Sequence, residues 1–327
     1  MADIIITEFI DDAAVATIPD TWQLHRDDSL AEKPDELAQL LGTARALIIR
    51  NKTQITSSLL DAAPSLQVIG RLGVGLDNID MDACQARGIT VCPAFGANAA
   101  SVAEYVIAAL LQLRRPVFSR VQAMLEGGFP RQLLSQAGEI GSMTLGLLGY
   151  GTIAREVARR ALAMDMRVIA FDPAIEQAAT GSEAAVELVS MEKLLAEADA
   201  ISLHVPLTAE TRDLISAKTI AMMRHGALLI NTARGEVVDL QAVADALDSG
   251  QLGGVALDVF KREPADAALL APLAGLDASV KQNLLLTPHI AGLTGEANWR
   301  VSMMTVENVL RVLGDVRKGD VLEGESS

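Results

Sequence analysis

Short apolar runs alternate with amphipathic stretches along most of the chain. The apolar runs predict strands, because they are short, rich in Ile, Leu and Val, and bounded by turn residues. These strands are expected at residues 4–7, 46–50, 67–70, 89–92, 144–148, 167–171, 200–204, 227–231, 253–259 and 284–287. Stretches with helical spacing separate them, and the longest helices are expected at 99–113 and 296–313. Strands that alternate with helices predict an α/β fold with parallel sheets.

One stretch in the middle of the chain has the order strand, glycine turn, helix, strand, acid. If the ligand is a dinucleotide, Gly149 allows the tight turn and Gly151 lets a pyrophosphate approach the backbone. The helix that starts near Thr152 would direct its free N–H groups at that pyrophosphate. Asp172 ends the second strand, where its carboxylate could accept hydrogen bonds from the ribose hydroxyls and would repel a 2′-phosphate, so NAD is predicted rather than NADP. Ala154 takes the place of the third glycine, and a plain structural turn is the alternative interpretation.

The composition favours a protein of two domains with aliphatic cores. The chain has 327 residues, of which 50% are hydrophobic and only 3% aromatic, and this length accommodates two domains. A formal charge of −15 argues against nucleic acid binding, which needs a basic surface. No apolar run reaches the ~18 residues of a membrane span, and no secretory signal pattern opens the chain, so a cytoplasmic protein without membrane contact is expected. Cys84 and Cys92 lack the spacing of a zinc site, so reduced thiols and no metal are expected.

The segment from about 115 to 141 differs from the regular alternation. It bears several arginines and is interrupted by glycines. We interpret it as an arm that packs on a partner subunit.

The histidines are the natural candidates for a catalytic base, because hydride transfer from an alcohol to NAD needs a group that takes the hydroxyl proton near neutral pH. His25 lies in a polar stretch, and His225 lies between a helix and a strand, where a structural role is sufficient. His204 and His289 each follow a predicted strand. Open α/β sheets bind ligands at that edge, so position alone favours His289 but leaves His204 open.

Two charged residues near the ends of later strands could assist the base. Arg234 follows the strand at 227–231 in the sequence Asn-Thr-Ala-Arg-Gly, and could bind an anionic substrate. Glu263 lies in the segment 258–264, Asp-Val-Phe-Lys-Arg-Glu-Pro. Taken alone, the arginine could be a solvated surface charge and the glutamate a loop carboxylate.

Together, four motifs resemble the D-isomer-specific 2-hydroxyacid dehydrogenase family: the glycine stretch in mid-chain, NTARG, DVFKREP and TPHIAG at 287–292. The resemblance covers essentially the whole chain, and the motifs occur in the family's order. It implies that Arg234 binds and polarises the carbonyl and carboxylate of the substrate. It further implies that His289 exchanges the hydroxyl proton and that Glu263 orients the imidazole and favours its protonated form.

The resemblance also implies two similar α/β domains with parallel sheets. A flavodoxin-like substrate-binding domain would comprise residues 1–98 and 289–327, and a doubly wound NAD-binding Rossmann domain would comprise residues 99–288. The active site would lie between them, and bending at the two connections would exclude water. Family members usually dimerise through the cofactor domains, so a homodimer is expected.

Further cofactor and substrate contacts are assigned by the same resemblance. For the cofactor these are Thr152 and Ile153 at the phosphates, Asp172 at the ribose, Pro206 and Thr211 along the adenosine, and Thr232, Ala233 and Asp258 near the nicotinamide. Gly149 and Gly151 are cofactor contacts by their place in the glycine turn, and His204 could line the cofactor cleft because it follows a strand at the same edge of the sheet. Segment 71–80 resembles the family's substrate loop, in which the N–H groups of Val74 and Gly75 would hold the carboxylate. Arg234 and His289 would complete the substrate contacts.

Additional arginines suggest a substrate with a second anionic group. Arg50 ends a predicted strand, Arg71 precedes the glycine loop, and Arg131 in the arm is a further candidate. A monocarboxylate needs one cation and the loop amides, whereas a second anionic group would use more charge-assisted hydrogen bonds. The segments at 46–53 and 71–80 are most similar to the 3-phosphoglycerate dehydrogenase branch of the family and resemble its sulfolactate dehydrogenases.

Other interpretations remain at this stage. A hydroxypyruvate or glyoxylate reductase would leave Arg50 and Arg71 as structural residues. An NAD-sensing protein like the family's corepressor relatives would keep the same motifs. Short-chain dehydrogenases are disfavoured because neither tyrosine is followed by a lysine at the required spacing, and L-lactate-type enzymes because their glycine turn lies near the N-terminus.

Overall fold

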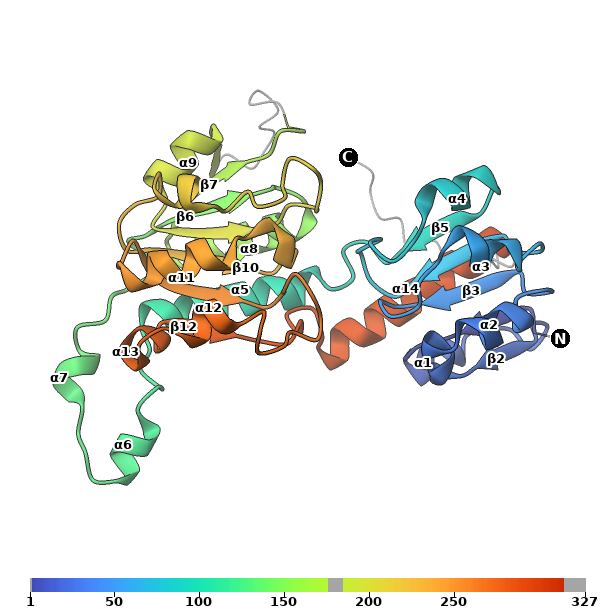
Figure 1. Ribbon diagram of the computed structural model, residues 1–327, viewed down its shortest axis with the longest axis horizontal. Helices are drawn as coiled ribbons and strands as arrows, with labels where there is room; N and C mark the ends of the chain where they lie inside the picture. Colours follow the sequence, from blue (N-terminus) through green and yellow to red (C-terminus); the bar gives the residue numbers. More distant parts are fainter. Residues whose placement is uncertain (1, 176–184, 315–327) are drawn as a thin grey trace. The chain divides into compact units, whose positions relative to one another are not determined.

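The structure is a computed structural model that describes residues 2–175 and 185–314 and divides into two compact units (Figure 1). Unit 1 comprises residues 1–98 and 293–327, and unit 2 comprises residues 99–292. The chain leaves unit 2 at 292/293, four residues after the predicted crossing at 288/289. The reason is local: the carboxylate of Asp258 accepts hydrogen bonds from the amides of Ile290 and Ala291, so these residues belong to unit 2.

Unit 1 has a five-stranded parallel sheet in the order β2-β1-β3-β4-β5, which is the flavodoxin-like order. Its strands are β1 (Ile4–Ile6), β2 (Leu24–Arg26), β3 (Ala46–Ile49), β4 (Val68–Arg71) and β5 (Thr90–Pro93). Its helices are α1 (Asp12–Val15), η1 (Asp28–Glu32), α2 (Pro34–Leu40), α3 (Ser57–Asp61), α4 (Met81–Ala86) and α14 (Gly295–Leu313). α14 packs on the sheet so closely that a Cβ at Gly70 would lie 2.6 Å from Val309.

Unit 2 has a seven-stranded parallel sheet in the order β12-β11-β10-β9-β6-β7-β8. The strands are β6 (Thr144–Leu148), β7 (Arg167–Phe171), β8 (Val186–Leu188), β9 (Ala200–Leu203), β10 (Ala227–Asn231), β11 (Leu252–Leu257) and β12 (Leu284–Leu286). The order reverses between β6 and β9, as in the doubly wound dinucleotide-binding fold. The predicted α/β class with two Rossmann-like parallel sheets is therefore confirmed.

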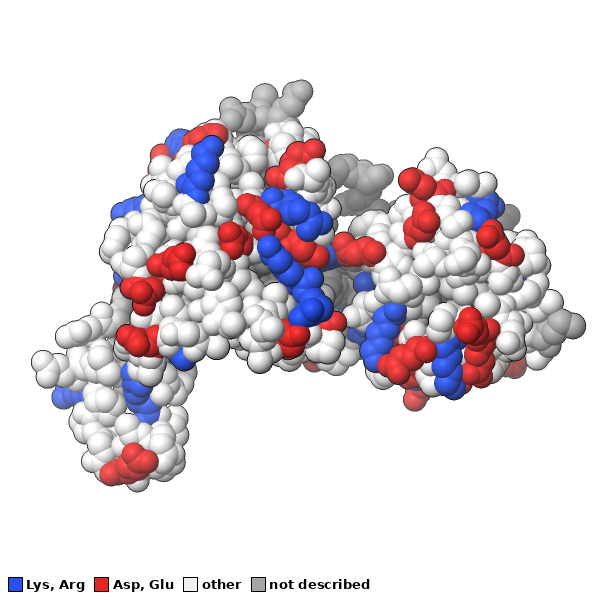
Figure 2. Space-filling model, in the orientation of Figure 1, with Lys and Arg blue, Asp and Glu red and all other residues white. Residues whose placement is uncertain are grey.

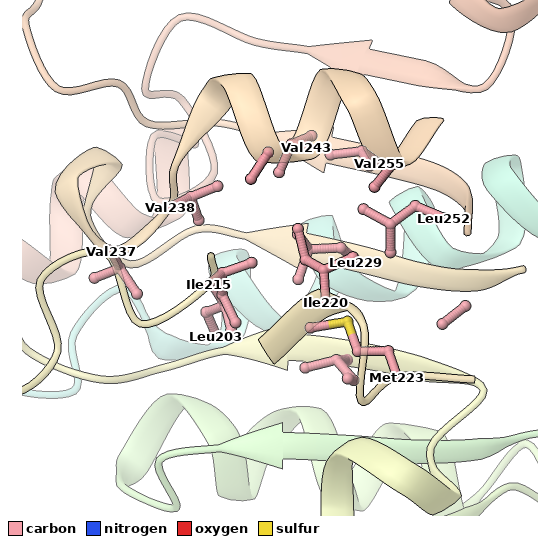
Figure 3. Packing of buried hydrophobic residues seen from close by; sticks show 14 of the residues in the cluster. Leu203, Ile215, Ile220, Met223, Leu229, Val237, Val238, Val243, Leu252 and Val255 are labelled. Atoms are coloured by element: carbon pink, nitrogen blue, oxygen red, sulfur yellow. The ribbon is translucent and has the colours of Figure 1, made fainter. Parts of the chain in front are cut away.

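The helices of unit 2 cover both faces of this sheet, except α6 and α7, which lie in an arm that extends away from it (Figure 1). They are α5 (Ala99–Arg114), α6 (Val121–Leu125), α7 (Arg131–Leu134), α8 (Thr152–Leu162), α9 (Met191–Glu197), α10 (Ala217–Ile220), η2 (Gly235–Val237), α11 (Leu240–Asp248), α12 (Ala271–Ala274) and α13 (Ala278–Lys281). On one face, Val243 of α11 packs with Leu229 and Val255 of the sheet in an aliphatic layer (Figure 3). This layer fixes β10 and β11, whose ends carry candidate site residues.

Two strands were missed by the sequence analysis. β2 lies where only helical spacing was expected between residues 7 and 46, and β8 lies beyond β7. Each is a three-residue strand at the edge of its sheet, so it has one hydrogen-bonded neighbour and only a short apolar signal. In β2, for example, His25 and Arg26 follow Leu24, and no apolar run marks the strand.

Surface features of the described residues bear on two further expectations. On the face shown in Figure 2, basic and acidic side chains lie interspersed. No helix within the described ranges is long and apolar enough to cross a membrane. The arm with α6 and α7 extends away from the sheet of unit 2 (Figure 1) and exposes several large apolar side chains. These are Phe118, Val121, Met124, Leu125, Phe129 and Leu133.

Candidate functional site

The glycine turn lies at the point where the strand order of unit 2 reverses. Gly149 follows β6 with φ of +88°, a conformation that favours glycine. A Cβ there would lie 2.5 Å from the carbonyl oxygen of His204, which follows β9. The amide of His204 also donates to the carbonyl of Leu148 at 2.7 Å. The two loops therefore touch at the carboxyl edge of the sheet, where doubly wound folds bind dinucleotides.

The residues around this turn fit a bound dinucleotide. Gly151 is the N-cap of α8 and provides no capping side chain, so the first N–H groups of this 11-residue helix are directed outward. A Cβ at Gly151 would meet no heavy atom within 4 Å, so there is open space beside the backbone. Thr152 is exposed at the start of the helix and Ile153 is partly buried. Further along the same edge, the hydroxyl of Thr232 is buried without a hydrogen-bond partner, which a ligand group could supply.

Asp172 braces the glycine turn from the end of β7. Its carboxylate accepts hydrogen bonds from the amide of Tyr150 at 2.8 Å and from the amide of Ala174 at 2.9 Å. Each carboxylate oxygen retains further acceptor capacity. The acid is therefore held beside the turn with its acceptors available for ribose hydroxyls.

His204 is held by its own strand. Its Nε2 lies 2.9 Å from the hydroxyl of Ser202, and burial lowers the pKa of His204 to about 4. This imidazole is therefore neutral near pH 7. In the loop that follows, the hydroxyl of Thr211 donates to the carbonyl of Pro206 at 2.6 Å and accepts from the amide of Thr208, which closes the loop along the predicted adenosine contact.

The loop that carries Arg234 is fixed by Asn231 at the end of β10. The side chain of Asn231 is fully buried; it accepts from the amide of Ala233 and donates to the carbonyl of Arg234, both at 2.9 Å. Gly235 packs against the following loop so tightly that a Cβ would lie 2.0 Å from the carbonyl carbon of Phe260. The Arg234 loop and the loop after β11 are thus in direct contact.

Glu263 and His289 form the closest pair among the predicted catalytic residues. Nδ1 of His289 lies 2.6 Å from Oε2 of Glu263, and Oε1 of Glu263 accepts from the amide of Phe260 at 3.2 Å. Because a carboxylate only accepts hydrogen bonds, Nδ1 carries a hydrogen and Nε2 is left to exchange a proton. The two residues come from the loops after the neighbouring strands β11 and β12.

Asp258 holds the loop that carries His289. Its side chain is 1% exposed, and it accepts from the hydroxyl of Thr287 at 2.6 Å and from the amides of Ile290 and Ala291 at 2.8 Å. Its carbonyl accepts from the amide of His289 at 2.7 Å. His289 has φ of 55°, a left-handed conformation that is uncommon outside glycine. Asp258, predicted as a cofactor contact, thus has a second set of partners that the sequence did not reveal.

In unit 1, Arg50 is partly buried and has defined neighbours. Nη2 donates to Oδ1 of Asn298 at 2.7 Å, and the guanidinium lies 5.8 Å from the ring centroid of Phe9. The loop at 50–53 is held by Glu8, which is 5% exposed. Its carboxylate accepts hydrogen bonds from four backbone N–H groups and from the hydroxyl of Thr53. Glu8 and Asn298 were not singled out by the sequence, because their partners lie 42 and 248 residues away.

Arg71 folds over its own loop. Nε donates to the carbonyl of Gly75 at 2.7 Å and Nη1 to the carbonyl of Leu72 at 2.6 Å. Among the described residues, no acceptor is recorded for the amides of Val74 and Gly75, the two groups predicted to hold a carboxylate. Arg131 begins α7 in the arm, and its side chain is exposed.

Comparison with known proteins places these features in a family context. Residues 107–291 match the family model of the D-isomer specific 2-hydroxyacid dehydrogenase NAD binding domain. The chain is 45% identical over 317 residues to the (S)-sulfolactate dehydrogenase of Chromohalobacter salexigens, with 96% of this chain and 99% of the relative covered. It is 38% identical over 280 residues to the hydroxypyruvate reductase of Thermotoga maritima, with 86% and 88% covered.

Two further comparisons define the extent of the similarity. The chain spans about half the length, 51%, of the D-3-phosphoglycerate dehydrogenase of Archaeoglobus fulgidus, to which it is 36% identical over 85% of its own residues. Among solved structures, the D-lactate dehydrogenase of Aquifex aeolicus in complex with NAD and lactic acid aligns with a TM-score of 0.77 and 31% identity, with 95% of this chain and 96% of that chain covered.

Proposed function

We propose that this chain, which belongs to the D-isomer-specific 2-hydroxyacid dehydrogenase family, interconverts a 2-hydroxy acid and its 2-oxo acid by NAD-dependent hydride transfer, and that its substrate bears a second anionic group. The observation that carries the chemistry is the 2.6 Å hydrogen bond between His289 and Glu263 at the carboxyl edge of the sheet. The specificity rests on Arg50, which is held in a defined position in unit 1.

The proton is handled by His289. When bound at the glycine turn, NAD supplies or accepts the hydride. During oxidation, Nε2 of His289 takes the hydroxyl proton of the substrate, and during reduction it returns that proton to the carbonyl oxygen. Glu263 accepts from Nδ1, fixes the tautomer and stabilises the imidazolium as it forms.

The substrate carboxylate is held by the groups that donate hydrogen bonds. Arg234 would bind the carboxylate and polarise the carbonyl, with its loop fixed by Asn231. The amides of Val74 and Gly75 would provide further donors. Charge-assisted bonds of this kind orient the reacting carbon as well as bind it.

Arg50 would bind the second anionic group. The most extensive similarity described above is to a sulfolactate dehydrogenase, whose substrate by name carries a sulfonate. The phosphate of 3-phosphoglycerate would likewise need a cationic side chain at a fixed position. Hydroxypyruvate reduction is the competing activity and would leave Arg50 without a substrate contact.

A substrate screen tests this proposal. The oxidation of NADH is followed with 3-phosphohydroxypyruvate, sulfopyruvate, hydroxypyruvate, glyoxylate and pyruvate, and each assay is repeated with NADPH. We expect preference for one of the first two substrates and for NADH. Preference for hydroxypyruvate or glyoxylate would refute the second anionic group, and no turnover of any 2-oxo acid would refute the enzymatic function in favour of an NAD-sensing protein.

The variant Arg50→Ala tests the role of the arginine directly. Loss of a charge-assisted hydrogen bond, about 1.5–3 kcal/mol, should raise KM for the dianionic substrate roughly 10- to 100-fold while KM for pyruvate changes little. Arg45→Ala is the matched control. Arg45 directly precedes β3 and Arg50 directly follows it, so the two residues lie at opposite ends of the same strand. Equal KM changes in the two variants would contradict the assignment.

Dimerisation through the arm is part of the same proposal. Phe118 and Leu125 are 81% and 78% exposed, and apolar side chains gathered on one extended segment favour contact with another protein surface. A homodimer through unit 2 predicts a mass of two chains by light scattering and dissociation of the variant Leu125→Asp. The proposed location is the cytoplasm, in keeping with the unpaired thiols of Cys84 and Cys92.

A further inference from the structure

A line of three side chains connects helix α5 to the loop that carries His289. The hydroxyl of Tyr105 on α5 lies 2.5 Å from the hydroxyl of Thr287, and the hydroxyl of Thr287 lies 2.6 Å from Oδ1 of Asp258. Tyr105 and Thr287 are 182 residues apart in the sequence. Neither residue has a role in the proposed chemistry.

The direction of these hydrogen bonds follows from their donors. The hydroxyl of Thr287 donates its single proton to Oδ1 of Asp258. The oxygen of Thr287 can then only accept from the phenol of Tyr105. Burial raises the pKa of Tyr105 and the charge of Asp258 raises it further, which outweighs the opposite effect of the hydrogen bond with Thr287, so the phenol keeps its proton and remains a donor.

The last residue of this hydrogen-bonded chain, Asp258, holds the backbone around His289. Asp258 accepts the amides of residues 289, 290 and 291 through its carbonyl and carboxylate. These bonds hold His289 at φ of 55°, although the left-handed region is disfavoured for residues with a Cβ. If the carboxylate rotates, two of the three amides lose their acceptor.

The line also joins the two segments by which the chain enters and leaves unit 2. Tyr105 lies in α5, which begins at residue 99, and Thr287 lies just before the end of the unit at residue 292. A hydrogen bond between these segments fixes the loop of His289 to a 16-residue helix whose apolar residues, such as Val102, Val106 and Leu110, are buried.

We propose that Thr287 and Tyr105 are positioning residues for His289, acting through the carboxylate of Asp258. Thr287 fixes the rotamer of that carboxylate, and Tyr105 fixes the hydroxyl of Thr287. This inference rests on the proposed role of His289 as the proton-exchanging residue. If it is correct, loss of either hydroxyl lowers kcat, whereas a side chain that only packs would affect stability alone.

The experiment compares Thr287→Val, which removes the hydroxyl at nearly constant shape, with Thr287→Ser, which keeps it. We expect Thr287→Val to lower kcat about 10- to 100-fold, since a small misplacement of a catalytic group has effects of that order, with KM for the 2-oxo acid and for NADH changed less than about 3-fold. Thr287→Ser should retain kcat within about 3-fold. Equal losses in both variants would show that the methyl group matters rather than the hydroxyl, and would overturn the proposal.

A matched control separates positioning from stability. In α10 the hydroxyl of Thr219 donates to the carbonyl of Leu214 at 2.7 Å and accepts from the amide of Ser216 at 2.9 Å, so Thr219→Val removes hydroxyl hydrogen bonds in the same unit that do not involve the loop of His289. We expect this variant to melt at a lower temperature and to keep its kcat. If kcat falls in proportion to the melting temperature in both Thr→Val variants, the effect of Thr287 is structural and the proposal fails.

Two double variants test the order of the line. Tyr105→Phe alone should lower kcat about 3- to 10-fold, and should have no further effect in Thr287→Val, because the phenol acts through Thr287. Thr287→Val should likewise have no further effect on kcat in His289→Gln. Full activity of His289→Gln would refute the proposed function itself, whereas an inactive His289→Gln with an unaffected Thr287→Val would refute only the positioning line.

Discussion

The substitution Glu8→Gln offers a direct test of how unit 1 presents Arg50. Oε1 of Glu8 accepts from the amides of Arg50 and Thr53 and from the hydroxyl of Thr53, at 2.8 to 3.0 Å. Oε2 accepts from the amides of Asn51 and Lys52 at 3.2 and 3.1 Å. A glutamine has one acceptor oxygen, and this oxygen should replace the one that has three donors. Its NH₂ group would then face two N–H donors.

The expected loss can be worked out from these contacts. Two hydrogen bonds to a charged acceptor are removed, each worth about 1.5–3 kcal/mol, and the amides of Asn51 and Lys52 lose this acceptor. Glu8 itself is 5% exposed, so water has little access to the position of the lost carboxylate oxygen. We expect the free energy of unfolding of unit 1 to fall by about 3–5 kcal/mol.

Tryptophan fluorescence measures this transition selectively. The chain has two tryptophans, Trp22 and Trp299, and both belong to unit 1. Urea unfolding followed by this signal therefore reports on unit 1 within the full chain, where a single two-state transition cannot be assumed. The matched control is Glu32→Gln: Glu32 contacts Lys52 of the same loop at 3.4 Å, but its side chain is 77% exposed, so a change within about 0.5 kcal/mol is expected.

The pH dependence provides an independent check. Burial alone would raise the pKa of Glu8, but the hydrogen bonds from Thr53, Lys52 and Arg50 outweigh it, and the pKa lies below its ordinary value near 4.5. The folded state therefore binds this proton more weakly than the unfolded state, so the stabilisation is present above about pH 4.5 and is lost as the pH falls through the lowered pKa. The difference between wild type and Glu8→Gln should be constant from pH 6 to 8 and shrink below pH 4.5. A difference below 1 kcal/mol at pH 7, or one that does not change with pH, would refute this reasoning.

Three further predictions concern unit 2. Gly235→Ala would place a Cβ 2.0 Å from the carbonyl carbon of Phe260, so it should abolish activity and lower the melting temperature measured by circular dichroism. In the control Gly42→Ala of unit 1, the new Cβ has open space around it, so activity and melting temperature should stay unchanged. If Asp172 binds the ribose hydroxyls and repels a 2′-phosphate as predicted, Asp172→Ala should raise KM for NADH at least about tenfold and reduce the preference for NADH over NADPH in steady-state assays. Burial lowers the pKa of His204 from 6.5 to about 4, so as the pH falls the unfolded state binds this proton before the folded state does. The folded state therefore loses stability as the pH falls from about 6.5 towards 4. In His204→Gln the melting temperature should fall less between pH 7 and pH 5 than in the wild type.

The sequence predicted the parts of this molecule that depend on local pattern. The strands of both sheets and the glycine turn follow from apolar runs and from residues adjacent in the chain. The short edge strands β2 and β8 were missed because three residues with one neighbour carry little periodic signal. The pairing of strand ends also followed from topology, because the loops after β10, β11 and β12 meet at one sheet edge.

The sequence did not predict which polar side chains support the site. Glu8 reaches a loop 42 residues away, and Tyr105 reaches Thr287 at a separation of 182 residues. Such contacts depend on tertiary packing, and no local motif specifies them. Arg71 also makes contacts that its place in the sequence did not indicate, because its Nε and Nη1 donate to carbonyls of the loop that follows it.

One arrangement recurs at the ligand-binding edges of the two sheets. Glu8 after β1 accepts amides from the loop after β3, Asp172 after β7 accepts an amide from the turn after β6, and Asp258 after β11 accepts amides from the loop after β12. In each case an acid at the end of one strand fixes the loop of the neighbouring strand in the sheet. Backbone N–H groups at these edges have no ladder partner, so a carboxylate satisfies them. Each of these carboxylates is thus satisfied by backbone N–H groups of a neighbouring loop, so the negative charge and the position of that loop are stabilised together.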